Sequence, residues 1–254
     1  MIDIHCHILP RIDDGPKTLF DSLNMAKAAV RDGIHTVIAT PHHSTTYYNA
    51  KADILHYVQD LNDALQEENI DLKVRPGQET RIYGELLEDL KKGDILPLNE
   101  TSSYLFIEFP SGGVPLYADK LLYDIQVAGL TPVIVHPERN AELIARPDKL
   151  YQLVKNGAAT QITAGSLVGD FGKKISQFSQ QIIEANLTHF IASDAHNTTN
   201  RPFKMAEAMN FVEKKYGVDM LYYFTENAEL LLEDSSIIQE VPQRIAKKKF
   251  LGIF

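Results

Sequence analysis

Hydrophobic residues along this chain fall in short continuous runs that alternate with longer amphipathic stretches. Runs rich in β-branched residues predict seven strands, at residues 1–7, 34–40, 72–79, 104–109, 131–136, 159–164 and 189–194. Apolar positions spaced three and four apart predict helices, at residues 21–31, 52–68, 84–92, 116–128, 141–155 and 174–186, with further helical stretches through 215 and 232. Gly33, Gly93, Gly129 and Gly157 each stand just past such a stretch, where a helix commonly ends.

This alternation of strand and helix is typical of a parallel α/β fold, either closed into a barrel or open. Residues 131–135 and 189–192 are almost entirely apolar, as expected for parallel strands that are covered on both faces. The length of 254 residues matches one α/β barrel, which usually has about 250 residues. No linker or internal repeat divides the sequence, so we predict a single domain over residues 1–254, with 234–254 as a C-terminal tail that ends in a basic cluster and an apolar tip.

Composition excludes several classes of protein. A formal net charge of −9 disfavours a protein whose main partner is nucleic acid, because that affinity comes from phosphate neutralisation by Lys and Arg. No apolar run approaches the roughly 20 residues that a membrane span needs, and the first residues lack the pattern of a signal peptide. The single cysteine, Cys6, fits a reducing compartment, so a cytoplasmic protein without a membrane span is expected.

Ionisable side chains stand at or just past the ends of the predicted strands. This set comprises His5, His7, His42, Glu79, Glu108, His136, Asp194 and His196. An ionisable group that ends a buried apolar strand is costly unless it is paired or bound to a metal. The carboxyl ends of parallel strands meet at one edge, so we expect these side chains to converge there. A lone H-x-H pair is weak evidence, but the accumulated set predicts a metal centre.

Mixed imidazole and carboxylate ligands suit Mn²⁺, Fe²⁺ or Zn²⁺ and do not choose among them. The candidate ligands are too many for one ion, so two or three divalent ions are expected. Clustered ions activate water at neutral pH and clamp the oxygens of a phosphoryl group. The sequence therefore predicts a hydrolytic enzyme.

The chain resembles the polymerase and histidinol phosphatase (PHP) superfamily in a combination of motifs: Asp3-Ile4-His5-Cys6-His7, Asp13-Asp14-Gly15, Pro41-His42-His43, Glu79, Glu108, His136-Pro137-Glu138-Arg139 and Ser193-Asp194-Ala195-His196. Over nearly its whole length it is similar to the manganese-dependent protein-tyrosine phosphatases of bacterial capsule and exopolysaccharide operons. The resemblance implies a distorted TIM-like barrel of seven β/α units, the PHP fold, holding three metal ions, with manganese as the expected metal.

The resemblance also implies three groups of ligands. The first ion would be held by His5, His7, Glu79 and Asp194, the second by Glu79, Glu108 and His136, and the third by Asp14, His42 and His196. Of the two neighbouring aspartates Asp14 is favoured as the ligand, with Asp13 a partner of a ligand. His43 is expected in a loop and to point elsewhere, and Cys6 stands where the family leads us to expect serine.

Two arginines, Arg139 and Arg201, follow His136 and His196 by three and five residues and should lie on the rim of the site. Guanidinium groups bind phosphate oxygens bidentately, and the resemblance assigns the same role. The mechanistic hypothesis is in-line attack on phosphorus by a water that the ions activate, with both arginines stabilising the negative charge.

Other functions make different demands on the sequence. A cysteine-dependent phosphatase needs C-x5-R, whereas four residues separate Cys6 from Arg11. Amidohydrolases commonly use a carboxylated lysine where Glu79 and Glu108 stand, and the net acidity counts against a nuclease. A histidinol-phosphate-like small-molecule phosphomonoesterase and a non-catalytic metal-bearing regulatory scaffold remain open. The family likeness implies a phosphotyrosine protein as the partner, the tail of a bacterial tyrosine kinase that regulates polysaccharide synthesis and export.

Overall fold

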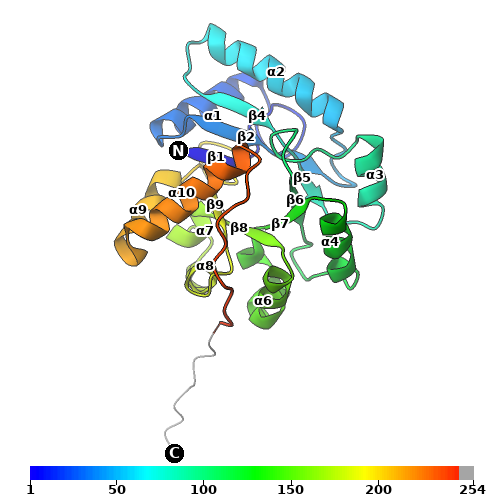
Figure 1. The fold of residues 1–254 in the computed structure, drawn as a ribbon. Coiled ribbons are helices and arrows are strands. Elements are labelled where there is room, and N and C mark those ends of the chain that lie inside the picture. Colours follow the sequence, from blue (N-terminus) through cyan, green and yellow to red (C-terminus); the bar gives the residue numbers. More distant parts are fainter. Residues whose placement is uncertain (246–254) are drawn as a thin grey trace, which may run out of the picture.

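Parallel strands and helices alternate along residues 1–245, the part of the chain that the computed structural model describes (Figure 1). The strands are β1 (Ile2–Cys6), β2 (Thr36–Ala39), β3 (His42–His43), β4 (Lys73–Pro76), β5 (Glu79–Arg81), β6 (Tyr104–Glu108), β7 (Thr131–Val135), β8 (Ala159–Thr163) and β9 (Phe190–Ala192). The helices are α1 (Leu19–Arg31), α2 (Lys51–Glu67), α3 (Leu86–Lys92), α4 (Ala118–Val127), the short 3₁₀ turn η1 (Pro137–Arg139), α5 (Ala141–Ala145), α6 (Pro147–Lys155), α7 (Ala164–Val168), α8 (Lys173–Glu184), α9 (Met205–Tyr216) and α10 (Val218–Leu232).

The strands close into a barrel with seven positions, counted over the described residues. One sheet has the order β1-β2-β4 and the other the order β3-β5-β6-β7-β8-β9. The chain runs from β2 into β3 and from β4 into β5 within a few residues, so each pair is one bent strand that takes part in both sheets. The barrel closes between β9 and β1, where the Asp194 amide donates to the His5 carbonyl at 2.8 Å and the His7 amide to the Ala195 carbonyl at 2.9 Å.

This architecture confirms the predicted α/β barrel of seven β/α units and shows where it is distorted. The strand predicted at 72–79 is interrupted at Gly77 and Gln78, which separate β4 from β5. The helix predicted at 141–155 breaks at Arg146 because the residue before a proline disfavours helical backbone. Helix α7 was not predicted, since its five residues are too few to show a periodicity.

The predicted helix ends agree with the structure. Gly33, Gly93, Gly129 and Gly157 all have positive φ, between 82° and 99°, as expected for a residue that ends a helix in the left-handed conformation. No helix in residues 1–245 is long and apolar enough to cross a membrane. The single domain over 1–254 stays a prediction, and the basic cluster and apolar tip of the tail lie mostly outside the described residues.

One end of the barrel is covered by the C-terminal part of the chain. Leu231 of α10 and Ile237 of the following segment pack with Phe106 and Phe190 in a buried apolar cluster. The hydroxyl of Tyr104, at the start of β6, donates to the Ser235 carbonyl at 2.7 Å, so this cover lies at the end where the strands begin. The opposite edge, where the strands end, is left for the side chains that the sequence predicts to converge.

Gly77 allows the bent strand β4–β5 to lie tightly against its neighbour. A Cβ atom built on this buried glycine would lie 2.6 Å from Cγ2 of Ile38 and 3.0 Å from Cδ2 of Leu98. Such contacts require the surrounding core to move. The absence of a side chain at Gly77 therefore helps to place Glu79 two residues later.

We expect Gly77→Ala to lower the free energy of unfolding by about 1–3 kcal/mol, the usual cost of overpacking a core. Gly84→Ala is the matched control, because a Cβ at Gly84 meets nothing within 4 Å, and it should change stability by no more than about 1 kcal/mol. Urea unfolding followed by circular dichroism measures both. Equal stability of the two variants would contradict the proposed close approach.

Candidate metal centre

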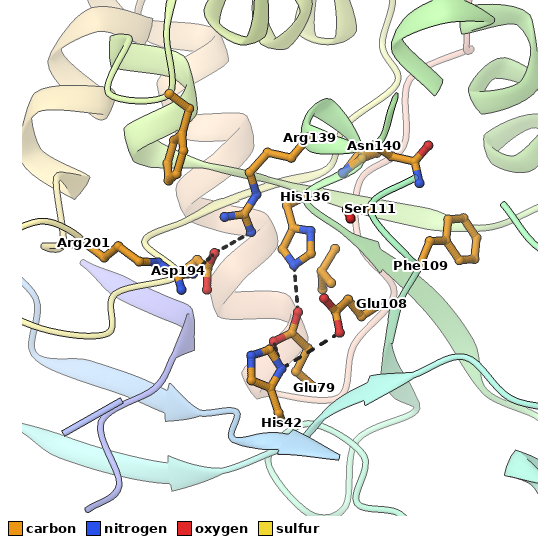
Figure 2. Close-up of a pocket in the computed structure, with 13 residues that line it drawn as sticks. His42, Glu79, Glu108, Phe109, Ser111, His136, Arg139, Asn140, Asp194 and Arg201 are labelled. Atoms are coloured by element: carbon orange, nitrogen blue, oxygen red, sulfur yellow. Dashed lines mark hydrogen bonds and ion pairs between the residues drawn. The ribbon is translucent and has the colours of Figure 1, made fainter. Parts of the chain in front are cut away.

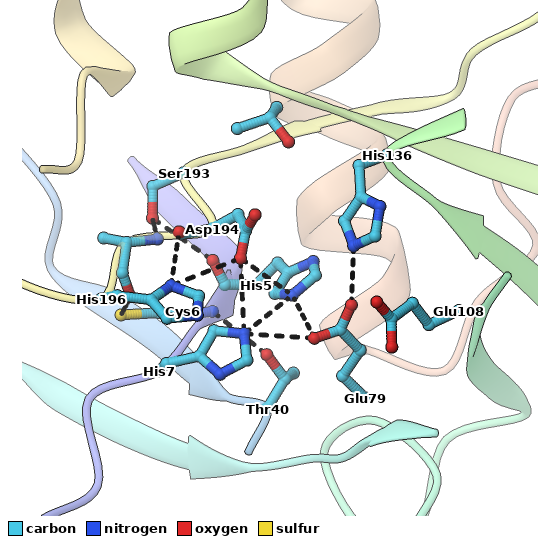
Figure 3. A network of polar contacts seen from close by, with 12 residues as sticks. His5, Cys6, His7, Thr40, Glu79, Glu108, His136, Ser193, Asp194 and His196 are labelled. Carbon is cyan, nitrogen blue, oxygen red and sulfur yellow. Dashed lines mark hydrogen bonds and ion pairs between the residues drawn. The ribbon is translucent and has the colours of Figure 1, made fainter. Parts of the chain in front are cut away.

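The predicted ligands come together at the edge where the barrel strands end. His5 lies on β1, His42 on β3, Glu79 on β5 and Glu108 on β6, while His136 and Asp194 follow β7 and β9 closely. His7, Asp14 and His196 lie in the loops just beyond β1 and β9. Figure 3 shows most of these side chains pointing toward one another.

Four ligand atoms from three positions of the barrel face a common point. Nε2 of His5 lies 3.3 Å from Nε2 of His7, and these nitrogens lie 3.4 and 3.2 Å from Oε2 of Glu79. The same two nitrogens lie 3.5 and 3.4 Å from Oδ1 of Asp194. Four ligands placed tetrahedrally about 2.1 Å from one divalent ion would be separated by about 3.4 Å. The five distances from the two imidazole nitrogens match this separation, and His5, His7 and Glu79 form a compact cluster with the spacing of ligands to one ion.

Hydrogen bonds orient three of the histidines for this role. Nδ1 of His5 lies 2.9 Å from Oε1 of Gln161, and Nδ1 of His7 lies 2.7 Å from Oδ2 of Asp13. Nδ1 of His196 lies 2.9 Å from the carbonyl of Asp194. Because an oxygen acceptor on Nδ1 fixes the proton there, Nε2 of each ring is left with its lone pair for a metal.

A second group lies nearer the surface. Oδ1 of Asp14 is 3.4 Å from Nε2 of His42 and 3.2 Å from Nε2 of His196, and His7 offers a further ligand atom to the same group. The Asp14 side chain is 43% exposed, so this group opens to solvent. Asp14 thus lies beside His42 and His196, as the resemblance implies, while Asp13 orients His7 through its Nδ1.

The third group differs from the expected set of Glu79, Glu108 and His136. Nδ1 of His42 lies 2.9 Å from Oε2 of Glu79 and 3.9 Å from Oε2 of Glu108, and these three form the compact cluster. His136 contacts the other oxygen of Glu79 instead, with Nε2 2.7 Å from Oε1. His42 therefore stands between two groups and faces each with a different ring nitrogen.

The cluster contains buried polar atoms that lack a well-formed hydrogen bond. Among the described residues, Oε2 of Glu79, Oε2 of Glu108 and Nε2 of His196 are buried and have ion-pair neighbours at 2.9–3.2 Å, but none of them makes a hydrogen bond of good geometry. Buried polar atoms are rarely left unpaired, because desolvation without a partner is costly. Electron-pair donors of this kind, gathered at one edge, fit divalent cations.

Electrostatics hold the pKa of the Asp194 carboxyl low and keep two of the histidines, His136 and His196, neutral. Burial alone would raise the pKa of Asp194, but the charges of the Arg139 and Arg201 guanidinium groups hold that pKa well below its usual range. Burial and the charge of Arg139 lower the pKa of His136 to about 4. Burial likewise lowers the pKa of His196 to about 4. Carboxylate and neutral imidazole are the forms that bind metals.

Two of the site residues have backbone conformations that non-glycine residues rarely adopt. φ is 35° at His136 and 52° at Asp194. Buried hydrogen bonds anchor the second of these: the Ser193 amide donates to Oδ1 of Asp3 at 2.9 Å, and the Ser193 hydroxyl donates to Oδ2 of Asp3 at 2.5 Å. Strained backbone at functional positions persists where the surrounding structure holds it in place.

Both predicted arginines line a cavity of about 360 Å³ that opens beside the cluster. Figure 2 shows Arg139 and Arg201 approaching Asp194 from two sides. Nη2 of each donates to Oδ2 of Asp194, in the case of Arg201 at 2.9 Å, and Nη1 of Arg201 lies 3.6 Å from Oδ2 of Asp14. The guanidinium groups are thus fixed next to the predicted ligands with further N–H donors available.

Cys6 and His43 point away from the centre, as expected. The Cys6 thiol is fully buried and lies 3.7 Å from the Ala195 carbonyl, in the core cluster outside the site. His43 lies in strand β3 rather than in the predicted loop, because it pairs beside Thr80 of β5, and its Nδ1 bonds the Asn49 carbonyl.

Two residues around the site were missed by sequence reasoning. Gln161 orients His5, and Arg81 binds Oε2 of Glu108 through Nε at 3.0 Å. A polar residue inside the run 159–163 was a usable signal for Gln161. Arg81 lies two residues after Glu79, and strand alternation places both on one face, which was a weaker signal.

Comparisons with known proteins identify the family of this chain. The family model for capsular polysaccharide synthesis, CpsB/CapC, matches residues 1–233. Tyrosine-protein phosphatase YwqE of Bacillus subtilis (strain 168) is 52% identical over 255 residues, which cover 100% of both chains. The putative tyrosine-protein phosphatase CapC of Staphylococcus aureus is 39% identical over 255 residues, again covering 100% of both chains.

The similarity extends to three-dimensional structure. One of the solved structures described as those of YwqE from Bacillus subtilis and CpsB from Streptococcus pneumoniae, "unique metal-dependent tyrosine phosphatases", matches with a TM-score of 0.95 at 52% identity, over 97% of this chain and 100% of the other. The resemblance inferred from the motifs is confirmed, and the predicted enzyme class agrees with the names of these relatives. The chain therefore belongs to the CpsB/CapC family of capsular polysaccharide synthesis.

Proposed function

We propose that this protein is a metal-dependent tyrosine-protein phosphatase whose active centre is the cluster described above. The names of its relatives support the activity. The observation on which the proposal mainly depends is the pair of imidazole nitrogens of His5 and His7, which lie 3.3 Å apart and each 3.2–3.5 Å from a carboxylate oxygen of Glu79 and one of Asp194, as ligands of one ion do. The further proposed ligands are Asp14, His42, Glu108, His136 and His196.

The donor set supports two or three divalent ions. Three overlapping groups of side chains have ligand atoms within 4.8 Å of one another. Nitrogen and oxygen donors together suit Mn²⁺, Fe²⁺ or Zn²⁺, and we propose Mn²⁺ from the family resemblance. Divalent ions held there supply a water nucleophile at neutral pH and neutralise the charge of a phosphate group.

Arg139 and Arg201 are the proposed phosphate-binding residues. Asp194 holds both guanidinium groups on the cavity wall through Oδ2, while its Oδ1 faces His5 and His7. Their remaining N–H donors can bind phosphate oxygens, and bidentate charge-assisted hydrogen bonds of this kind are strong. Because the arginines are already positioned, little reorganisation is needed when charge develops on those oxygens.

The proposed reaction is hydrolysis of a phosphate ester of tyrosine. A water oxygen bonds to phosphorus as the bond from phosphorus to the phenolic oxygen breaks, and the phenolate takes up a proton, which leaves tyrosine and inorganic phosphate. A phenol has a pKa near ~10, so its anion is a fair leaving group and needs little help from a general acid. The buried Cys6 thiol plays no part in this reaction.

The proposed protein substrate is the phosphotyrosine-bearing tail of a bacterial tyrosine kinase that regulates polysaccharide synthesis or export. Membership of a capsular polysaccharide synthesis family supports this partner. A cytoplasmic location is proposed with it, because the kinase tail would be reached there. Hydrolysis of a small phosphomonoester such as histidinol phosphate, and a non-catalytic scaffold, are the alternatives that the first experiment separates.

Release of inorganic phosphate should be fastest from a phosphotyrosine peptide, compared with a phosphoserine peptide and histidinol phosphate at equal concentrations. A chelator should abolish release, and added Mn²⁺ should restore it, because the proposed nucleophile depends on the ions. Histidinol phosphate as the best substrate would overturn the proposed substrate class. Bound ions without release from any of the three would favour the scaffold.

Arg139→Ala should lower kcat/KM for the phosphotyrosine peptide by about 10²–10³-fold, the usual effect of removing one donor to developing charge. Arg146→Ala is the control, since its guanidinium is 75% exposed and contacts only Glu142 among the ion pairs of the described residues. Steady-state kinetics at saturating Mn²⁺ measures both. A loss in Arg139→Ala no larger than in the control would exclude the proposed role.

Ions should stabilise the folded protein even without substrate. Saturation of one site at 100 times its Kd adds about 2.7 kcal/mol, so Tm should rise when Mn²⁺ replaces a chelator. Asp14→Ala should reduce both this rise and the number of bound ions per chain. Asp60→Ala, which removes an exposed carboxylate on α2, should leave both unchanged. Identical ion content in the two variants would argue against Asp14 as a ligand.

A further inference from the structure

The cavity beside the cluster has a polar side and an apolar side. Its polar lining includes the two arginines and the carboxylates already described. Its apolar lining is formed by Phe109, Val135, Pro137 and Phe171. A phosphate bound to the arginines would leave the group esterified to it facing that apolar lining, and Phe171 is the member that also touches a phosphate-binding residue.

Phe171 lies directly against Arg139. Cζ of the guanidinium stands 5.3 Å from the centre of the phenyl ring, a distance at which a cation is attracted to an aromatic face. The side chain is still 37% exposed, so it is only partly covered by its neighbours. One aromatic surface thus remains free beside the proposed phosphate site.

The position of Phe171 is fixed by the turn that contains it. Gly169 and Gly172, with φ of 105° and 89°, flank the residue, and the Gly172 amide donates to the Gly169 carbonyl at 2.9 Å. The ring packs against Gly165 of α7, where an added Cβ would lie 3.3 Å from Cε2 of Phe171. A side chain at Gly165 would require the ring to shift by a few tenths of an ångström, so the glycine leaves room for the phenyl group in this position.

We propose that Phe171 is a specificity-determining residue that recognises the aromatic ring of a phosphotyrosine. This inference rests on the proposed function, since it concerns the leaving group of the same reaction. A phenyl ring on the phosphate oxygen can pack edge-to-face or offset against Phe171, whereas the methylene of a phosphoserine presents little surface there. Phe171 therefore favours aryl over alkyl phosphates, in addition to its contact with Arg139.

Binding of non-hydrolysable phosphonates distinguishes recognition of an aryl group by Phe171 from its contact with Arg139. The full-length protein saturated with Mn²⁺ is titrated calorimetrically with phenylphosphonate and with methylphosphonate. Phe171→Ala should weaken phenylphosphonate about three- to tenfold, the effect of losing one aromatic pair, and should leave methylphosphonate within about twofold. Phe171→Leu, which keeps an apolar side chain, should give a smaller loss in the same direction.

Tyr222→Ala is the matched control, because Tyr222 is an exposed aromatic residue of α10 that does not line the cavity. It should leave both dissociation constants unchanged. Equal weakening of both phosphonates in Phe171→Ala would mean that the ring only positions Arg139, and unchanged phenylphosphonate binding would mean that it does not touch the ligand. Either result overturns the proposal. Failure of the proposed function would appear separately, as no phosphate release from phosphotyrosine by the unmodified protein.

Discussion

The contact between the first and last strands of the barrel is the constraint on which the site depends. Two backbone hydrogen bonds join β9 to β1, and they place Asp194 beside His5 and His7, more than 180 residues earlier in the chain. The Asp3 carboxylate strengthens this seam through the amide and hydroxyl of Ser193. Without this closure the two histidines would have no carboxylate partner from the other end of the sequence.

Asp194 links the two halves of the proposed chemistry. Its Oδ1 faces the imidazoles of His5 and His7, and its Oδ2 accepts hydrogen bonds from Arg139 and Arg201. A carboxylate can serve both because its two oxygens point in different directions and each has two lone pairs. The spacing between the proposed ion site and the proposed phosphate site is therefore set by one planar side chain, held in a strained backbone conformation with φ of 52°.

The sequence predicts the architecture of the fold and the residues of the site, but not the details that depend on contacts between distant residues. Strand-and-helix alternation predicts the barrel because both faces of a parallel sheet are buried, which leaves apolar runs such as 131–135 that are easy to recognise. The order of ionisable residues at strand ends predicts which side chains converge. The bend at Gly77 is not predicted, because it depends on the close approach of Ile38 and Leu98, a contact between distant residues.

The sequence also does not predict which side chains of the cluster contact one another. That His42 rather than His136 stands with Glu79 and Glu108 depends on side-chain rotation at the ends of different strands, which no residue pattern records. The contact between Arg81 and Glu108 is not predicted either, because it depends on the register of β5 against β6, which sets these residues side by side. The spacing of residues along the chain predicts which face of a strand or which edge of the sheet a side chain occupies. Predicting a contact between two elements also requires the register in which they pack.

Depth in the barrel separates the strand residues of the proposed metal centre from its loop residues and from the residues proposed to meet the substrate. His5 and Glu79 come from strands and are completely buried, so neighbouring strands on both sides fix their positions. Asp14, Arg201 and Phe171 come from loops and remain partly exposed. Changes in those loops can alter the group that is recognised without moving the buried donors, because the strand register does not depend on them.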